Sequence, residues 1–539
     1  MTADVVADLM AAGHRFPHHI ALAHGDRETT YAELLRRVRA TAERLGPEPG
    51  PVGVLTDRSP ATVVALLGVL AAGGTYCPVD PAFPAARQKA LLMAAGCTRV
   101  IVTRPGTPVP EGADALHLPD AETEPRNPAP DSPGTRSAAP DLPAYTLFTS
   151  GSTGTPKPVL TPRRAITASV ASLRELFGLT PSDRVLQFAS LNWDTCFEEI
   201  LPALTVGATL VFADDAYTGS LPRMLRAVAA ARVTLLDLPT AFWHELVRHL
   251  AESGESLPGH VTTVVIGGEA VSPARLAEWR ALGTGRIRLV NTYGCTETTL
   301  ITHAVDLHGP RAPGPGAWWG EHDRVPIGLP LPHVVDAVGE DGELLVSGPA
   351  LALGYRGLPD ITAERFTTRE GPAGQGAVRW FRTGDRVSRN PHGHLVHEGR
   401  LDAEIKVRGI RVDPGEIEAH LTAHPRVGAA AVVGARTADR TTVTAYVVPQ
   451  HAGADTDGLA REVLRHLRDT VPGHLVPHRI TVVPGLVHTA GGKIDRLGTH
   501  RRHTAAAGAP PSASPASSVP ATAAPASAAP ATGQTEQDA

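Results

Sequence analysis

The feature that most constrains the fold is an alternation of short β-branched runs with amphipathic helical stretches, which continues from the N-terminus to about residue 400. Arg99–Val102 and Thr262–Ile266 are typical of buried strands, whereas Ala61–Ala72 and Pro222–Ala231 have the pattern of helices. Such alternation predicts an α/β fold with largely parallel sheets. A Pro-rich stretch at 105–143 interrupts the alternation, and we expect it to form a long surface connection.

The chain of 539 residues is too long for one hydrophobic core, since cores stop growing at about 250–300 residues. We predict a large N-terminal domain at 1–401 and a small α+β domain at 402–502, which begins with a hairpin at 405–412. Residues 503–539 are rich in Ala, Pro and Ser and cannot bury enough apolar surface to fold, so we predict a disordered tail.

Composition and charge argue against several classes of function. With 42% hydrophobic and 19% charged residues and a net charge of -5, the chain offers no electrostatic surface for nucleic acid. The longest apolar run, Ala61–Tyr76, is shorter than a membrane span and contains glycines, so no membrane partner is expected. Acidic residues near the N-terminus argue against a signal peptide, and four well-separated cysteines fit a reduced cytoplasmic protein.

A loop rich in Gly, Ser and Thr follows the predicted strand Tyr145–Phe148 and ends at a lysine. Its small residues let backbone N–H groups and hydroxyls approach a phosphate closely, and the lysine adds a positive charge. The spacing of a Walker A loop is not met, because Pro158 follows the lysine. A flexible linker is the alternative interpretation of the same residues. The predicted phosphate-binding residues are Thr149, Ser150, Gly151, Ser152, Thr153, Gly154 and Lys157.

This loop and six further motifs, found in the family's order between Tyr31 and Arg496, resemble the adenylate-forming superfamily. That superfamily includes acyl-CoA synthetases, luciferases and the adenylation domains of nonribosomal peptide synthetases. The resemblance implies ATP-dependent activation of a carboxylate. It also implies a large α/β domain of βαβ-type parallel sheets with a β-barrel-like subdomain, followed by a small mobile α+β domain. The motifs are LAAGGTYCPVD at 70–80, NTYGCTE at 291–297, GELLVSGPALALGY at 342–355, FRTGD at 381–385, GRLDAEIKVRGIRVDPGEIE at 399–418 and GGKIDR at 491–496.

The resemblance also implies which residues bind ATP. Tyr293 is expected to stack on adenine, and Asp385 to accept hydrogen bonds from both ribose hydroxyls, with Arg400 nearby. Thr296 is expected to contact the α-phosphate, and Glu297 to bind Mg²⁺. ATP and Mg²⁺ are therefore the expected cofactors.

Lys493 is implied to bridge the substrate carboxylate and the α-phosphate. The attacking carboxylate and the phosphate repel each other, and Mg²⁺ together with a positioned ammonium neutralises this charge in the transition state. Asp402 falls at the family's hinge position. There the small domain is expected to rotate after adenylation and to present Lys406, Arg408 and Gly409 for thioester formation.

The stretch Asn192–Leu201 resembles the helix that lines the family's substrate pocket. Asp194 matches the aspartate with which amino-acid-activating members pair the substrate ammonium, and its alternative role is a helix N-cap. Glu198 follows four residues later and therefore faces the same way on a helix. Two buried acids repel each other unless cations separate them, which favours a diamino acid. In an alternative helix register Glu199 would occupy the wall, and Glu198 would face solvent.

The other pocket positions are small or apolar and offer no second anion, which suits a long aliphatic chain ending in an amine. Glu198 also matches a glutamate in family members that select lysine or ornithine. We therefore predict lysine, β-lysine or ornithine as the substrate, ahead of arginine. By resemblance the further pocket positions are Thr195, Leu236, Val265, Gly267, Thr292, Leu300 and Ile301.

The partner expected for this chain is a phosphopantetheine carrier protein on another chain. No carrier signature follows Arg496 and no condensation domain precedes Tyr31, which favours a stand-alone adenylation enzyme. The need for a small accessory protein stays open. Two rival hypotheses are an acyl- or aryl-CoA ligase, against which Asp194 argues, and a catalytically inactive scaffold, which would be expected to lack Lys493 or Glu297.

Overall fold

The computed structural model describes most of the chain. Several predicted residues lie outside the described ranges: Ser152–Gly154 of the phosphate loop, Arg408, Gly409 and Lys493. The predicted tail is also outside them from residue 508 onward, whereas 503–507 continue the last helix. No described helix is long and apolar enough to cross a membrane. The described residues are 4–118, 139–151, 155–313, 324–370, 376–402, 404–407, 410–436, 441–451, 456–488 and 494–507.

A seven-stranded sheet, in the order β18-β8-β7-β4-β3-β5-β6, forms one half of the large domain. Its strands β3 to β7 run parallel, as the alternating pattern predicts, and β8 and β18 add an antiparallel edge. Within the stretch 105–143, expected to form a long surface connection, β6 pairs with β5, and residues 119–138 lie outside the described ranges. The strands are β3 (Pro51–Leu55), β4 (Thr75–Val79), β5 (Arg99–Val102), β6 (Asp114–His117), β7 (Pro143–Thr149), β8 (Lys157–Pro162) and β18 (Gly354–Tyr355).

A nine-stranded sheet, in the order β15-β14-β13-β12-β11-β9-β10-β1-β2, forms the other half. The six strands from β13 to β1 in this order are parallel, and the flanking strands are antiparallel. The strands are β1 (Ile20–His24), β2 (Arg27–Thr30), β9 (Arg184–Leu186), β10 (Thr209–Phe212), β11 (Leu235–Pro239), β12 (Thr263–Gly267), β13 (Arg288–Gly294), β14 (Ile301–His308) and β15 (Leu329–Pro330).

Helices join the two sheets through one continuous core. Phe197 of α6 packs against Tyr145 and Tyr76 of the seven-stranded sheet, with ring centroids 4.7 and 6.1 Å apart. These contacts fix α6 between the sheets, whereas α7, α8 and α9 cover the outer face of the nine-stranded sheet. The helices are α1 (Val5–Arg15), α2 (Tyr31–Leu45), α3 (Pro60–Ala71), α4 (Ala85–Ala95), α5 (Arg163–Phe177), α6 (Thr195–Val206), α7 (Leu221–Ala230), α8 (Thr240–Ser253), α9 (Pro273–Ala281) and α10 (Pro359–Arg365).

A third sheet has five strands and is antiparallel. Its long strand β20 pairs with β17, β19 and β21, so residues of the FRTGD motif lie in the middle of the sheet. The strands are β16 (Val335–Val338), β17 (Glu343–Ser347), β19 (Phe366–Glu370), β20 (Ala377–Arg389) and β21 (Leu395–Arg400).

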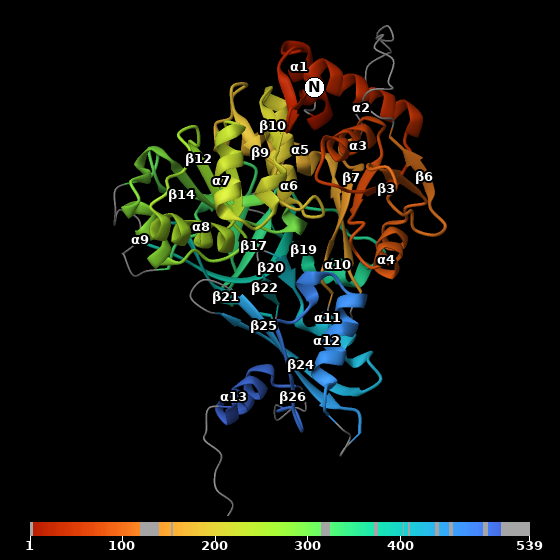
Figure 1. Ribbon diagram of the computed structural model, residues 1–539, viewed down its shortest axis with the longest axis vertical. Coiled ribbons are helices and arrows are strands. Elements are labelled where there is room, and N and C mark those ends of the chain that lie inside the picture. The colour runs from red at the N-terminus through yellow and green to blue at the C-terminus, as the bar shows by residue number, and fades with distance from the viewer. Residues whose placement is uncertain are drawn as a thin grey trace, which may run out of the picture.

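The small domain lies beneath the large one, with α11 toward it and α13 at the far end (Figure 1). The predicted hairpin is confirmed, because β22 and β23 pair in antiparallel register. A separate core of apolar residues such as Val432, Val463 and Leu467 holds the domain together. Its elements are β22 (Ile405–Val407), β23 (Ile410–Val412), α11 (Pro414–Thr422), β24 (Val427–Arg436), β25 (Thr441–Pro449), α12 (Leu459–Thr470), β26 (Arg479–Val482) and α13 (Arg496–Ala507).

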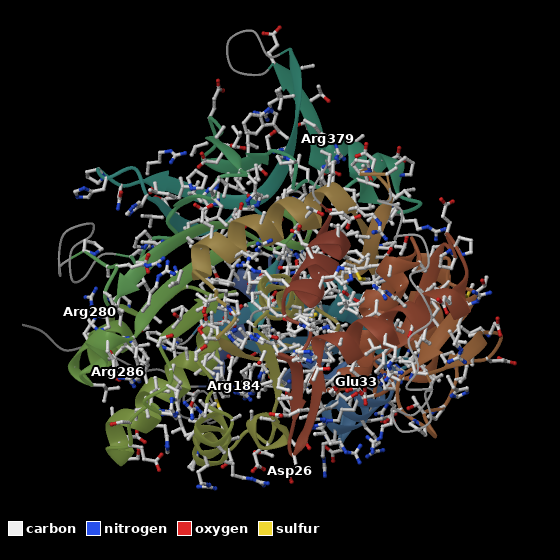
Figure 2. The ribbon with its side chains drawn as sticks, turned by 90° about the horizontal axis from the view of Figure 1, so that it is seen from above. Asp26, Glu33, Arg184, Arg280, Arg286 and Arg379 are labelled. Atoms are coloured by element: carbon white, nitrogen blue, oxygen red, sulfur yellow. The ribbon has the colours of Figure 1, made fainter. Side chains whose placement is uncertain are left out.

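Charged side chains of both signs lie around the periphery of the large domain. Figure 2 shows Arg280 and Arg286 near the edge of the nine-stranded sheet, and Asp26 and Glu33 along another side. This mixture of signs is consistent with the small net charge of -5.

Candidate active site

A cavity of about 310 Å³ lies where parallel strands of the nine-stranded sheet end, beside the start of α6. Crevices at the carboxyl ends of parallel strands are the usual ligand sites of open α/β sheets. The small domain closes one side of the cavity with Lys406, Ile410 and Arg411. The other lining residues are Arg58, Thr149, Phe188, Ala189, Ser190, Trp193, Asp194, Thr195, Glu198, Asp237, Leu238, Pro239, Gly267, Gly268, Thr292, Gly294, Cys295, Thr296, Leu300, Ile301, Asp385 and Arg400.

Asp194 and Glu198 both line this cavity from the beginning of α6. Asp194 occupies the N-cap position, yet its side chain makes no capping hydrogen bond. The carboxyl group lines the cavity, where hydrogen bonds with the Thr296 hydroxyl and with the backbone N–H groups of Asp194 and Thr195 oppose the rise of its pKa on burial.

Glu199 serves the scaffold and does not line the cavity. It is fully buried and accepts hydrogen bonds from the backbone N–H groups of Phe188 and Ala189, both at 2.9 Å, and from Gln187 Nε2 at 3.1 Å. The alternative register, with Glu199 on the wall and Glu198 in solvent, is wrong. Glu199 instead fixes the 187–189 segment, which supplies part of the cavity wall.

Asp237 is a further carboxylate in this cavity, which the sequence reasoning missed. The pocket position was assigned to Leu236, but Leu236 is fully buried in the apolar core between β11 and the helices behind it. Successive side chains of a strand point to opposite faces, so a shift of one residue exchanges the two. The expectation that the pocket offers no second anion is wrong for the same reason. A lone acid within the apolar run Leu235–Leu238 was the available signal.

These three carboxyl groups interact strongly. Burial raises the pKa of Glu198 well above its usual value, and the charges of Asp237 and Asp194 raise it further. Burial also raises the pKa of Asp237 to about 7 and that of Asp194 to about 6. Glu198 and Asp237 share a hydrogen bond, while Asp237 Oδ2 is buried without a hydrogen-bond partner among the described residues. The cavity therefore favours positively charged groups of a ligand.

Most of the remaining predicted pocket residues line the cavity as expected. They are Thr195, Gly267, Thr292, Leu300 and Ile301. Val265 does not line it: this residue is fully buried and belongs to the central core.

The segment that carries Leu300 has an unusual backbone. Thr299 and Leu300 both have positive φ angles, 58° and 66°, which residues other than Gly seldom adopt. Gly294 makes this turn possible, because a Cβ atom there would lie 1.9 Å from the Leu300 carbonyl oxygen. Backbone strain of this kind is commonly held in place at functional sites.

The residues expected to bind the nucleoside form one hydrogen-bonded group. The Tyr293 hydroxyl donates to Asp385 Oδ2 at 2.6 Å, and Arg400 and His397 contact Asp385 Oδ1 at 2.9 and 3.0 Å. Burial alone would raise the pKa of Asp385, but the hydrogen bond from His397 and the charges of Lys406 and Arg400 hold it well below its usual range. Asp385 is thus an ionised acceptor at the cavity edge. His397 was not identified from the sequence.

Glu297 lies behind Thr296 and is fully buried. It accepts a hydrogen bond from the Tyr355 hydroxyl at 2.7 Å and pairs with Arg411 Nη1 at 3.4 Å. Although burial raises its pKa, Arg411, Tyr355 and Lys157 together lower it, so this carboxylate is ionised. An ionised buried carboxylate fits a Mg²⁺ ligand. No group of three or more candidate metal ligands occurs among the described residues.

The described residues of the predicted phosphate loop lie between the domains. Thr149 lines the main cavity, and the Lys157 ammonium lies over the ring of Tyr355 at 5.7 Å from its centroid. Ser150 and Gly151 bond to the small domain.

Asp402, the predicted hinge residue, forms ion pairs with Arg400 at 2.6 Å and with Arg365 at 3.3 Å. Beyond it, the Lys406 ammonium lies 5.5 Å from the ring centroid of Tyr293, so the β22–β23 hairpin faces the cavity. Lys493 lies outside the described residues. Its neighbour Ile494 packs in the small domain with Val433 and Tyr446.

Comparison with known proteins identifies the class of this site. The AMP-binding enzyme family model matches residues 9–356, and the model for the AMP-binding enzyme C-terminal domain matches 416–493. The chain belongs to the AMP-binding enzyme family and is an adenylate-forming ligase of the nonribosomal peptide synthetase adenylation type.

The relatives found support this assignment. An isonitrile lipopeptide synthase of Streptomyces coeruleorubidus is 41% identical over 485 residues, covering 88% of this chain and 32% of that protein. The phosphinothricin tripeptide synthetase PhsC of Streptomyces viridochromogenes is 34% identical, covering 90% of this chain and 44% of that protein. The chain thus spans less than half the length of these curated relatives. Among solved structures, NpsA-ThdA of Klebsiella oxytoca, an artificially fused adenylation-PCP di-domain, has a TM-score of 0.77 and 26% identity, covering 89% of this chain and 94% of that chain.

Truncation of Glu198 and of Glu199, the neighbouring acids on α6, should have different effects on the stability of the large domain. Glu199→Ala is expected to destabilise the large domain by about 2–3 kcal/mol, because buried N–H groups lose their acceptor. Glu198→Ala removes like-charge repulsion and is expected to leave stability unchanged or slightly raised. Thermal unfolding of both variants tests this, and equal melting temperatures would contradict the assigned roles.

Proposed function

We propose that this chain uses ATP and Mg²⁺ to adenylate a basic diamino acid and then transfers it as a thioester to a phosphopantetheine carrier protein on another chain. Lysine, β-lysine and ornithine are the preferred candidates, followed by arginine. The observation that carries the proposal is the group of three carboxyl residues, Asp194, Glu198 and Asp237, in one cavity.

Two ammonium groups match this arrangement of charge. Asp194, at the start of α6, would pair with the ammonium next to the reacting carboxylate. Glu198 and Asp237 would hold the second ammonium, because together they supply at least one negative charge once a cation separates them. Arg58 also lines the cavity, but its guanidinium donates to the Phe188 carbonyl at 2.6 Å and stacks on Tyr217. Its charge is not among the causes that shift the pKa of Asp237.

The nucleotide would lie across Tyr293 and Asp385, with Arg400 holding the Asp385 carboxylate in place. Thr296 would contact the α-phosphate, and Lys493 would bridge that phosphate and the attacking carboxylate. Mg²⁺ held at Glu297 would neutralise phosphate charge. The residues of the chain thereby orient the carboxylate toward the phosphate and offset the repulsion between them.

The orientation of the small domain supports the transfer step. Its β22–β23 hairpin faces the cavity through Lys406 and Ile410, as the resemblance implies for thioester formation. The adenylation-PCP fusion among the structural relatives supports a carrier protein as the acceptor.

An ATP–pyrophosphate exchange screen across amino acids, without coenzyme A, tests this function. We expect lysine, β-lysine or ornithine to give the highest rate. Asp237→Asn and Glu198→Gln should each lower the preference for diamino over neutral amino acids at least about tenfold, since one buried ion pair is lost. Strongest exchange with an aryl or fatty acid would overturn the proposal.

The preference for a diamino acid should depend on pH. Asp237 has a pKa raised to about 7 in the empty cavity, so it is protonated below this pH and must lose its proton to pair with an ammonium. From pH 8 to pH 6 we expect the KM for the diamino acid to rise about tenfold more than the KM for a neutral amino acid. Both substrates share the dependence on Asp194. In the double variant Glu198→Gln/Asp237→Asn, which removes both titrating members of the pair, the ratio of the two KM values should be flat with pH, and a flat ratio in the wild type would contradict the model of the pair.

Lys493→Ala should lower pyrophosphate exchange by about 100-fold or more, because the transition state loses a positioned charge. ATP binding, measured calorimetrically, should persist because the nucleoside contacts remain. Lys89→Ala is a matched control, since Lys89 is half-exposed and pairs with Glu111 at 3.2 Å. Normal exchange by Lys493→Ala would remove the assigned role.

A further inference from the structure

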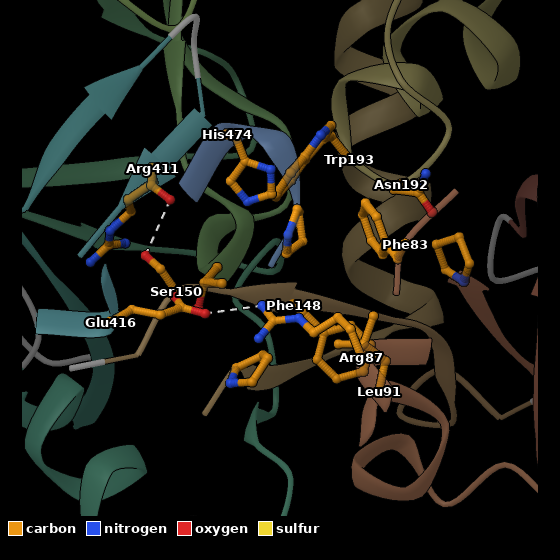
Figure 3. A pocket seen from close by; sticks show the side chains of 14 residues that line it. Phe83, Arg87, Leu91, Phe148, Ser150, Asn192, Trp193, Arg411, Glu416 and His474 are labelled. Atoms are coloured by element: carbon orange, nitrogen blue, oxygen red, sulfur yellow. Dashed lines mark hydrogen bonds and ion pairs between the residues drawn. The ribbon is translucent and has the colours of Figure 1, made fainter. Parts of the chain in front are cut away.

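The small domain places a carboxylate on the phosphate loop. Glu416 of α11 is fully buried, and its Oε2 accepts a hydrogen bond from the Gly151 N–H at 3.3 Å. Its Oε1 accepts from Arg87 Nη2 of α4 at 3.0 Å. Figure 3 shows this ion pair across a small cavity between the two domains.

The neighbouring loop residue is engaged as well. The Ser150 hydroxyl donates to the Arg411 carbonyl at 3.1 Å, and it accepts from the Asp413 N–H at 2.9 Å. Backbone N–H groups and hydroxyls of such a loop are the groups that bind phosphate oxygens. In this orientation the small domain therefore occupies the groups that would bind the leaving phosphates.

A cation of the small domain contacts the carboxylate that is proposed to bind Mg²⁺. The Arg411 guanidinium lies 3.4 Å from the Glu297 carboxylate, which is the group proposed to hold Mg²⁺. Arg411 is anchored from behind by Glu404. A guanidinium satisfies a buried carboxylate by charge and hydrogen bonding, as a bound cation would.

We propose that the small domain carries a charge mimic of magnesium pyrophosphate, with Arg411 taking the place of the metal at Glu297 and Glu416 taking the place of a phosphate oxygen at Gly151. This inference rests on the proposed function, which assigns Glu297 and Gly151 to the metal and phosphates. Arg411 and Mg²⁺ would compete for the Glu297 carboxylate, and Glu416 and a phosphate oxygen would compete for the Gly151 N–H. This orientation and bound magnesium pyrophosphate therefore exclude each other, and departure of pyrophosphate permits the small domain to dock.

Arg87 favours the ionised form of Glu416. Burial raises the pKa of Glu416 overall, and the charge of Arg87 and the hydrogen bonds from Arg87 and the Gly151 N–H offset part of this rise. The charge on Glu416 thus depends on contacts that exist only when the small domain is docked against the large one.

The test measures binding of inorganic pyrophosphate with Mg²⁺ to the full chain by calorimetry, without amino acid or carrier protein. Glu416→Gln is expected to bind pyrophosphate at least fivefold more tightly than the wild type, because a competing anion is gone. Arg411→Gln is a second, independent variant, which should lower the Mg²⁺ concentration needed for pyrophosphate binding at least fivefold.

Glu418→Gln is the matched control on the same helix. Glu418 pairs with Arg496 at 2.7 Å inside the small domain, so its loss should leave pyrophosphate affinity unchanged. Wild-type affinity in both Glu416→Gln and Arg411→Gln would overturn the proposal. Equal tightening in Glu418→Gln would overturn it too, since the effect would then reflect general loosening of the small domain.

A second measurement follows the orientation of the small domain relative to the large domain. Trp193 of the large domain contacts His474 of the small domain edge-on, with ring centroids 5.4 Å apart. Trp193 fluorescence, taken as the difference from a Trp193→Phe variant, should change when magnesium pyrophosphate is added to the wild type. No change at saturating pyrophosphate would overturn the proposal. Pyrophosphate binds without amino acid, so this result is separate from the exchange screen that tests the proposed function.

Discussion

Repulsion between carboxylates in a desolvated site is the interaction on which the rest of this structure depends. Asp194, Glu198 and Asp237 share one cavity, and Glu297 lies close enough to raise the pKa of Asp194. Neighbouring buried anions are stable only when cations, hydrogen-bond donors or protons offset their charge. The acids of the site differ in the partner that offsets their charge, and this difference distinguishes acids with a structural role from acids with a functional role.

Glu199 and Asp385 are satisfied by the chain itself. Backbone N–H groups and Gln187 bind Glu199, and Tyr293, His397 and Arg400 surround Asp385. Glu198 and Asp237 share a hydrogen bond and have raised pKa values, so a proton offsets their charge in the empty cavity, and an ammonium group of a ligand could take its place. A cavity that is unsatisfied in charge but shaped by rigid strands is well suited to selecting a substrate by its charge.

Glu297 is the acid whose partner belongs to the other domain. In the orientation described, Arg411 neutralises it, while Glu416 of the same domain binds the loop that is expected to hold phosphates. Orientation of the small domain and occupancy of the nucleotide site are thus linked through the same few groups. If the proposed function holds, such a link would order adenylation before transfer, because the charges of the site are balanced in each state by only one arrangement of the domains.

The sequence by itself determined the α/β class, the β22–β23 hairpin and the family, because these follow from local periodicity and from motifs whose residues are consecutive. It also predicted that Asp194 and Glu198 share a wall, since a four-residue spacing places them on one side of a helix, but only the structure excluded the alternative register with Glu199 on the wall. Only the tertiary structure decided that Asp237 and not Leu236 faces the cavity, because a strand's register depends on its neighbours in the sheet. The contacts of Glu416 with Arg87 and Gly151 join residues more than 260 positions apart, and no local pattern encodes such a distance. They arise from the packing of one folded domain against another.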